Sequence, residues 1–251
     1  MANRRIAAET ALYLYGISKS SRAKAASIAS EGIDGVHPVQ SLACEDFICW
    51  VSSVDAASFS RAISSNMENL EWLALHGVRH QKIVAEIAAR NTVVPARFGT
   101  IFSSEATLFK NVRARRTALE KVFAKISDAE EWGVKVFAEQ ARAPQPAERV
   151  RSGKDYLQLK AARLKKRPER DNSGLQELAA ELEKIAIDSA PTGKVSGTQQ
   201  DLLWQATFLV PRSRHGQWNQ ALKEFVKKWR GKRRIEVNGP WPPYSFVADA
   251  E

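Results

Sequence analysis

Two histidines have the spacing that could bind a metal ion. His76 and His80 are four residues apart, which on a helix places both imidazoles on one face, where they could share a zinc ion. The metalloprotease pattern needs a glutamate directly after the first histidine, but Gly77 stands there. A third ligand is not evident, since Glu71 and Glu86 lie off that face or too far along it. We therefore predict hydrogen-bonded structural histidines, with no bound metal and no cofactor.

The two cysteines, Cys44 and Cys49, flank the pair Glu45-Asp46. Metal sites usually use a closer pair of cysteines together with further ligands, and a disulfide framework needs more cysteines than two. If Glu45 and Asp46 form a tight hairpin turn, the two thiols do not face each other across the strands. We predict reduced, free cysteines.

The sequence contains no recognisable catalytic pattern. It has no nucleophile elbow, no Walker loop, no dinucleotide-binding glycine pattern and no Cys–His signature. The segment Gly193-Lys194-Val195-Ser196-Gly197 lacks the upstream glycine of a phosphate-binding loop. A triad assembled only in space stays open, but the sequence predicts a protein that is not an enzyme.

Two short segments could bind a partner. Arg97-Phe98-Gly99 could present Arg97 to an acidic group, or Arg97 could form an inter-domain salt bridge beside a buried Phe98, and we favour the latter. The segment from Trp241 to Tyr244, with Pro242 and Pro243 between them, resembles a proline-rich ligand. Prolines also stiffen a chain end so that aromatic side chains dock with little loss of entropy. We favour docking of Trp241 and Tyr244 onto the C-terminal domain.

The formal net charge of +10 favours acidic partners. The positive charge is concentrated in three places: Arg113, Arg115 and Arg116; Lys160 to Arg170, which includes Lys165, Lys166 and Arg167; and Lys227 to Arg234. Such runs could bind nucleic acid through its phosphates, and this is the alternative function. We favour a solvated helix face or a surface for acidic proteins, because the nearby aromatic residues follow apolar helical stripes and no RNA-recognition signature is present.

The composition is that of an ordinary globular protein, with 44% hydrophobic and 26% charged residues among 251. No apolar stretch approaches the length of a membrane-spanning helix, and the N-terminus lacks the pattern of a secretory signal. We expect a cytoplasmic protein with no membrane partner.

The first half of the chain predicts an α+β arrangement. Strand, helix and hairpin signals are followed by a helix that begins after Asp55 and breaks near Glu68-Asn69. Its apolar positions are Leu70, Leu73, Ile83, Val84 and Ile87. A second amphipathic helix is predicted over 105–126, with Leu108, Val112, Leu119, Val122, Phe123 and Ile126 on one stripe.

The second half predicts a strand over 131–137, a long charged helical insertion over about 152–190, a strand over 201–210, a helix from Ser213 and a strand over 234–237. This order suits a modified ferredoxin-like sandwich. We expect two domains, 1–128 and 129–251, the second carrying the insertion and an extended C-terminal tail.

Three segments in this order resemble a known family: Thr92 to Phe102 (TVVPARFGTIF), Glu131 to Val136 (EWGVKV) and Gly239 to Phe246 (GPWPPYSF). Preceded by an opening like Leu12 to Ile17 (LYLYGI), they are similar to the gas vesicle proteins GvpF and GvpL, and His80 stands where that family has a histidine. Each segment alone is weakly specific, whereas their order and spacing are not.

The resemblance implies two α+β domains, the C-terminal one ferredoxin-like, and no catalysis. It implies a minor structural or accessory role in gas vesicle assembly, by binding the small, hydrophobic shell protein GvpA and other assembly proteins in a chaperone-like or nucleating way. Two features depart from the family pattern: the high positive charge and the run Lys160 to Arg170. The residues that we expect to contact partners are Arg97, Phe98, Lys165, Lys166, Arg167, Trp241 and Tyr244.

Overall fold

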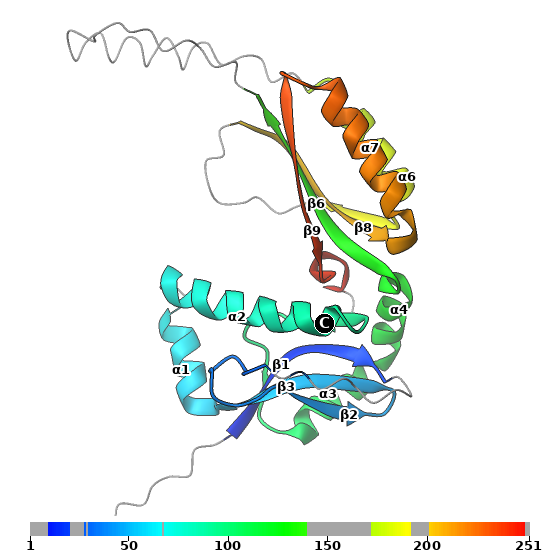
Figure 1. Ribbon diagram of the computed structural model, residues 1–251. Helices are drawn as coiled ribbons and strands as arrows, with labels where there is room; N and C mark the ends of the chain where they lie inside the picture. Colours follow the sequence, from blue (N-terminus) through cyan, green and yellow to red (C-terminus); the bar gives the residue numbers. More distant parts are fainter. Residues whose placement is uncertain are drawn as a thin grey trace, which may run out of the picture. The chain divides into compact units, whose positions relative to one another are not determined.

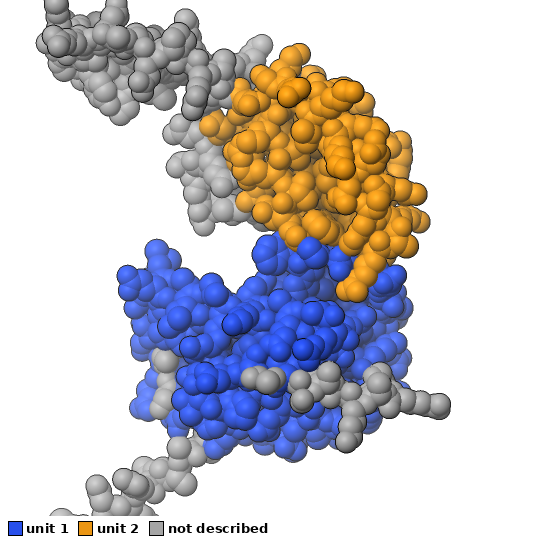
Figure 2. Space-filling view, viewed as in Figure 1, with its two compact units in different colours: residues 1–131, 240–251 blue, residues 132–239 orange. Residues whose placement is uncertain are grey.

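The structure is a computed structural model, and it describes residues 10–20, 28, 30–66, 68–139, 172–191 and 201–248. The chain forms two compact units (Figure 2). Unit 1 comprises residues 1–131 and 240–251, and unit 2 comprises residues 132–239. Both units combine helices with antiparallel strands, which confirms the predicted α+β class. The helical stretch predicted over 152–171 lies outside the described residues.

Unit 1 is built on an antiparallel sheet whose central strand, β1, pairs with three others. Alternating large apolar residues make β1 a strand with two buried sides. The sheet order is β2-β3-β1-β4, and β5 also pairs with β1. The strands are β1 (Thr10–Lys19), β2 (Gln40–Cys44), β3 (Phe47–Asp55), β4 (Val93–Pro95) and β5 (Ile101–Phe102).

In the described part of unit 1, four helices cover this sheet: α1 (Ala56–Asn66), α2 (Leu70–Ala88), α3 (Glu105–Ala114) and α4 (Arg116–Ile126). Asn69 caps α2 by accepting hydrogen bonds from the backbone N–H groups of Glu71 and Trp72, and Ser104 caps α3 in a capping box. The break near Glu68-Asn69 is confirmed. The helix predicted over 105–126 is instead two helices separated at Arg115, although all six residues of its predicted stripe are buried.

Helix α2 lies over one face of this sheet (Figure 1). The two faces bury different side chains. The α2 side holds Tyr13 and Trp50, which belong to one core cluster with Ile83, Val84 and Ile87 of α2. On the other side, Phe47 of β3 stacks on Phe123 of α4 with their ring centroids 5.8 Å apart. The register of β1 against β3 shifts between Leu14 and Gly16, so Tyr15 is an extra residue that also joins the α2 side.

The hairpin predicted around Glu45-Asp46 is confirmed, because β2 ends at Cys44 and β3 begins at Phe47. Cys44 pairs with Phe47 and Cys49 with Leu42, so the cysteines do not face each other, and both thiols are free and buried. Burial raises the pKa of Cys49 to about 12. Such thiols are poor nucleophiles at neutral pH.

The acidic turn of this hairpin is held by arginines from the α3–α4 region. Arg113 donates to a carboxylate oxygen of Glu45 at 2.9 Å, and Arg116 bridges Glu45 at 2.9 Å and Asp46. These side chains are partly exposed, so the network fixes the position of the hairpin tip more than it adds stability.

Unit 2 contains a four-stranded sheet in the order β7-β8-β6-β9, with two helices on one face (Figure 1). In chain order its described elements are β6 (Ala129–Ala138), α6 (Leu175–Ile185), β7 (Asp188–Pro191), β8 (Leu202–Pro211), the short turn η1 (Arg212–Arg214), α7 (His215–Lys228) and β9 (Arg233–Trp241).

The core of unit 2 lies between the sheet and its helices. Val134 and Val136 of β6 are fully buried, with Trp132 partly buried beside them on the same side of the strand. The helices contribute a stripe each: Leu175, Leu178, Leu182 and Ile185 from α6, and Trp218, Ala221, Leu222 and Phe225 from α7. Each stripe has the three- and four-residue spacing of an amphipathic helix.

Several predictions about elements are wrong in detail. The end of the predicted helical insertion is instead strand β7, Asp188–Pro191, and β9 runs four residues beyond the predicted strand, to Trp241. Leu70, assigned to the apolar face of its helix, is 80% exposed. Leu70 opens α2 directly after its cap, so it lies beyond the part of the helix that packs on the sheet.

Candidate functional site

An aromatic cluster lies under α2 in unit 1. Tyr13 is in ring contact with Tyr15, Phe59, His80 and Phe98, at centroid distances of 5.0 to 6.5 Å. Trp72 and His76 extend the cluster along α2, where their rings stack 4.1 Å apart. Such arrangements of rings stabilise beyond the area that they bury. We use "aromatic cluster" for Tyr13, Tyr15, Phe59, Trp72, His76, His80 and Phe98.

A hydrogen-bonded chain of three groups runs through this cluster. The backbone N–H of Gly99 donates to the Tyr13 hydroxyl at 3.1 Å, and the distance from that hydroxyl to Nδ1 of His80 is 2.9 Å. If the hydroxyl donates its hydrogen to Nδ1, the proton of the neutral imidazole lies on Nε2. Gly99 has φ +86°, in the left-handed region that glycine adopts most readily. The prediction that His80 is a hydrogen-bonded structural histidine is thus confirmed.

His80 is a neutral side chain in this setting. Its exposure is 3%, and burial lowers its pKa to about 4. The backbone of Ala96 opposes this shift only in part, because the effect of burial is larger. Nε2 of His80 has no partner in hydrogen-bonding geometry among the described residues. Burial likewise raises the pKa of the Tyr13 hydroxyl, so both groups stay uncharged at neutral pH.

Tyr15 connects the aromatic cluster to the loop that contains Ile33 and precedes β2. Its hydroxyl accepts a hydrogen bond from the backbone N–H of Ile33 at 2.6 Å and lies 2.8 Å from Oγ of Ser52. Burial raises the pKa of Tyr15 to about 12, although these hydrogen bonds oppose the shift. Through its hydroxyl group, Tyr15 of β1 therefore links β3 and this loop by hydrogen bonds.

The C-terminal tail packs against unit 1 through a buried carboxylate. Glu131 is 8% exposed, and its two oxygens accept hydrogen bonds from the backbone N–H of Ser245 at 2.8 Å and from its hydroxyl at 2.9 Å. Burial raises the pKa of Glu131, and the Ser245 hydrogen bonds oppose this. Tyr244 packs against the same core cluster as Tyr13, and Phe246 is buried. The prediction that the tail docks on the C-terminal domain is therefore wrong.

Residues from each of the three segments that carried the family resemblance make contacts within unit 1. Gly99 and Phe98, from the first segment, contact Tyr13. Glu131 begins the second segment and binds Ser245 of the third. Nothing in their sequence spacing indicated these contacts, which join residues 86 and 114 positions apart.

The other residues predicted to contact partners are dispersed. Arg97 is exposed at the surface, and Phe98 is half-buried in the aromatic cluster. Trp241 is 44% exposed, whereas the hydroxyl of Tyr244 is buried. Lys165, Lys166 and Arg167 lie outside the described residues.

The arrangement holds segments together and has no evident reacting group. Within the described ranges, no three His, Cys, Asp or Glu side chains lie close enough to hold a metal ion. His76 uses Nδ1 to contact the carbonyl of Trp72 at 2.9 Å. Among the same residues, no helix combines the length and apolarity needed to cross a bilayer.

The basic segment Lys227 to Arg234 does not form a base-stacking surface. Trp218 and Trp229, the aromatic residues near it, are 0% and 6% exposed. The guanidinium of Arg233 lies 4.6 Å from the ring centre of Trp229, and that of Arg234 lies 4.5 Å from the ring centre of Phe137. None of these contacts supports the nucleic-acid-binding alternative.

Known proteins resemble this chain over almost its whole length. The profile of the family described as "Gas vesicle synthesis protein GvpL/GvpF" matches residues 11–248. Gas vesicle protein L of Streptomyces sp. (strain CB03234) is 26% identical over 244 residues, covering 89% of both chains. Gas vesicle protein F of the same strain is 27% identical over 256 residues, covering 94% of this chain and 98% of its own.

The fold also matches solved structures. The crystal structure of the gas vesicle protein GvpF from Anabaena sp. PCC7120 superposes with a TM-score of 0.68 at 20% identity, covering 95% of this chain and 98% of that one. The GvpF structure from Microcystis aeruginosa gives a TM-score of 0.64 at 19% identity, with 94% and 98% covered. From the family match over residues 11–248, this chain belongs to the GvpL/GvpF family of gas vesicle synthesis proteins.

Proposed function

We propose that this protein is an accessory or minor structural protein of gas vesicle assembly, which binds the shell protein GvpA and other assembly proteins in a chaperone-like or nucleating role. The family match over residues 11–248 carries this proposal. The protein acts in the cytoplasm, in association with gas vesicles, and adhesion to other polypeptides is its task. The neutral, packed His80 and the free, buried cysteines agree with a role that needs no chemistry.

The surface that we assign to the shell protein is an apolar stripe on α2. Leu70, Leu75 and Val78 are 80%, 58% and 69% exposed. At 3.6 residues per turn, Val78 lies between Leu70 and Leu75 around the helix axis, and the three side chains span an arc of about 140°. Exposed leucines and valines gathered on one face are typical of a protein-binding site. We call Leu70, Leu75 and Val78 the α2 stripe.

The residues predicted from the sequence take two roles in this proposal. Trp241 is 44% exposed and contacts partners directly, as does the exposed Arg97. Phe98 and Tyr244 are partly buried against the core of unit 1 and hold the contact segments in place. Lys165, Lys166 and Arg167 remain predicted partner contacts.

We further propose that the two compact units are two domains and that unit 2 is a modified ferredoxin-like sandwich. Its described elements follow the order β-α-β-β-α-β that characterises this fold. The sheet order β7-β8-β6-β9 places the first strand, β6, between the third and the fourth, which agrees with that topology.

Co-purification with the shell protein tests the function. The tagged chain is co-expressed with a GvpA-type shell protein, and the amount of shell protein retained on the resin is measured. We expect Val78→Glu to reduce this amount by about tenfold, since a carboxylate would have to be desolvated in an apolar contact. Val36→Glu is the matched control, because Val36 is 75% exposed and lies outside the α2 stripe.

The outcomes distinguish an error in the assigned contact surface from an error in the proposed function. If Val78→Glu and Val36→Glu retain equal amounts of shell protein, the α2 stripe is not the contact. If the unaltered chain retains none, direct binding of the shell protein is wrong.

A further inference from the structure

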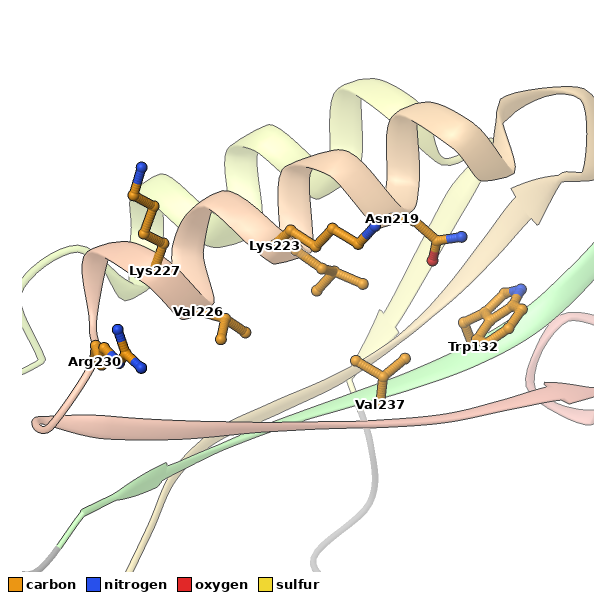
Figure 3. A pocket seen from close by; sticks show the side chains of 8 residues that line it. Trp132, Asn219, Lys223, Val226, Lys227, Arg230 and Val237 are labelled. Atoms are coloured by element: carbon orange, nitrogen blue, oxygen red, sulfur yellow. The ribbon is translucent and has the colours of Figure 1, made fainter.

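A groove on unit 2 lies between helix α7 and the outer strand β9 (Figure 3). It has a volume of about 550 Å³ and is lined by Trp132, Asn219, Leu222, Lys223, Val226, Lys227, Arg230 and Val237. Trp132 and Val237 rise from the strands, and Val226 extends from the helix toward them. We call these eight residues the α7–β9 groove.

The groove is formed by a second stripe of α7, distinct from the one that enters the core. Asn219, Lys223, Val226 and Arg230 recur at intervals of four, three and four residues, which keeps them on one side of the helix and of the turn that follows it. The core stripe, which contains Trp218 and Phe225, is buried. The helix therefore presents one apolar face to its own sheet and a mixed face to this groove.

The floor of the groove is apolar and accessible. Val226 of α7 and Val237 of β9 both line the groove. They are 51% and 38% exposed, so the apolar floor is open to solvent. Trp132 and Leu222 complete the floor. Apolar side chains left open on both walls of a groove favour a partner that brings apolar side chains of its own.

The rim of the groove is cationic. Lys223, Lys227 and Arg230 are all exposed, and none of them forms an ion pair with an acidic group in the part of the chain that the structure describes. Lys228, next to them on α7, differs, because it forms an ion pair with Glu177 at 2.6 Å. Three uncompensated cations along one side favour a partner with negative charge on its flank.

We propose that the α7–β9 groove binds an acidic amphipathic helix of a partner protein. The partner helix lies beside α7 and above β9, with leucine-like side chains on the floor and carboxylates against Lys223, Lys227 and Arg230. From Asn219 to Arg230 the stripe extends about 16 Å along a helix axis, which matches about three turns of a partner. The proposal rests on the groove itself and does not depend on the gas vesicle role.

A helix fits this site better than the other ligands. Added strands need a continuous ladder of donors, but Pro240 and Pro242 at the end of β9 carry no N–H group. Small-molecule sites usually include a few fixed polar groups, whereas the charged groups here are flexible side chains at the rim. Single-stranded nucleic acid is bound by successive stacking rings, whereas Trp132 is the one aromatic side chain among the eight lining residues.

The test is a binding titration with the full chain, followed by fluorescence anisotropy. The probe is a fluorescein-labelled, helix-forming peptide of about three turns, with leucines on one face and glutamates on both flanks. The reference probe has lysines in place of the glutamates. We expect the acidic peptide to bind at least about tenfold more tightly at low salt, with a preference that falls as salt is added.

Matched variants locate the site. We expect Lys223→Glu with Lys227→Glu to weaken binding of the acidic peptide by about tenfold or more, and Val226→Gln to weaken it by about fivefold. Lys110→Glu with Lys121→Glu makes the same charge change at exposed positions of unit 1 and should change the affinity by less than about twofold. Circular dichroism checks that every variant is folded.

Three results would overturn the proposal. The first is equal affinity for the acidic and the basic peptide. The second is that the two double variants weaken binding of the acidic peptide equally, or that Val226→Gln has no effect on it. Either result would mean that the peptide binds by general electrostatic attraction. The third is displacement of the acidic peptide by a single-stranded DNA oligonucleotide, together with loss of DNA binding in the variant with Lys223→Glu and Lys227→Glu. The groove would then be a site for phosphate groups.

Discussion

Buried His80 makes the stability of unit 1 depend on pH in the acidic range. The pKa of His80 is about 4 in the folded protein, against 6.5 for an unperturbed histidine side chain. Between these two pH values, His80 is protonated in the unfolded chain and neutral in the folded chain. The stabilisation by neutral His80 is complete above pH 6.5 and is lost as the pH falls from 6.5 to 4. At about 1.4 kcal/mol per pH unit, the total loss is about 3 kcal/mol, and about 2 kcal/mol is lost by pH 5.

The substitution His80→Gln isolates this effect. The glutamine cannot titrate, so the variant should be less stable at pH 7.5, where it loses the fit of the imidazole to Tyr13, but should lose about 2 kcal/mol less than the unaltered chain on going to pH 5. Urea unfolding at both pH values, followed by circular dichroism and tryptophan fluorescence, measures the free energy of each transition. His37→Gln, at a half-exposed imidazole, is the control for removing a histidine.

Equal pH dependence of the unaltered chain and His80→Gln would refute this reasoning. It would mean that His80 takes up its proton without unfolding, and that burial does not keep it neutral.

Two further predictions concern local packing. Ser245→Ala removes the hydroxyl hydrogen bond to the buried Glu131 carboxylate and should destabilise the protein by about 1–2 kcal/mol. It should also speed limited proteolysis at the C-terminus, and unchanged cleavage would show that this bond does not hold the tail. Gly77→Ala and Gly16→Ala should have opposite effects on Tm. A Cβ at Gly77 meets open space within helix α2 and should stabilise by up to about 1 kcal/mol. A Cβ at Gly16 would lie 2.9 Å from the Val94 carbonyl and 2.8 Å from Cγ2 of Val93, and should cost about 1–3 kcal/mol. A rise or a fall in Tm with both substitutions would contradict this reasoning.

Periodic hydrophobicity predicted most elements of the fold, because helices and strands repeat their buried positions over short distances. The stripe from Leu108 to Ile126 is buried as expected, but its helix breaks at Arg115, where the apolar period continues and gives no sign of an end. Strand β7 was missed because it is short and ends in Pro191, a residue that usually terminates strands. As a strand at the edge of its sheet, β7 tolerates a residue without an N–H group.

The site was less predictable than the elements, since it depends on contacts between distant parts of the chain. The spacing of His76 and His80 raised the possibility of a metal site, but the partner of His80 is Tyr13, on a strand 67 residues away. Glu131 was part of a recognised segment, yet its partner Ser245 became evident only when the tail was placed on unit 1. The sequence predicted the helix of Val226, but not the α7–β9 groove, to which Val226 turns because it lies one residue beyond the buried Phe225.

The most direct test of the assembly role is gas vesicle formation in a host whose own copy of this gene has been deleted. Floating cells and electron microscopy report whether vesicles are present. We predict that deletion abolishes vesicles, that the unaltered chain and Val36→Glu restore them, and that Val78→Glu does not. Normal vesicles in the deletion strain would contradict the role in assembly.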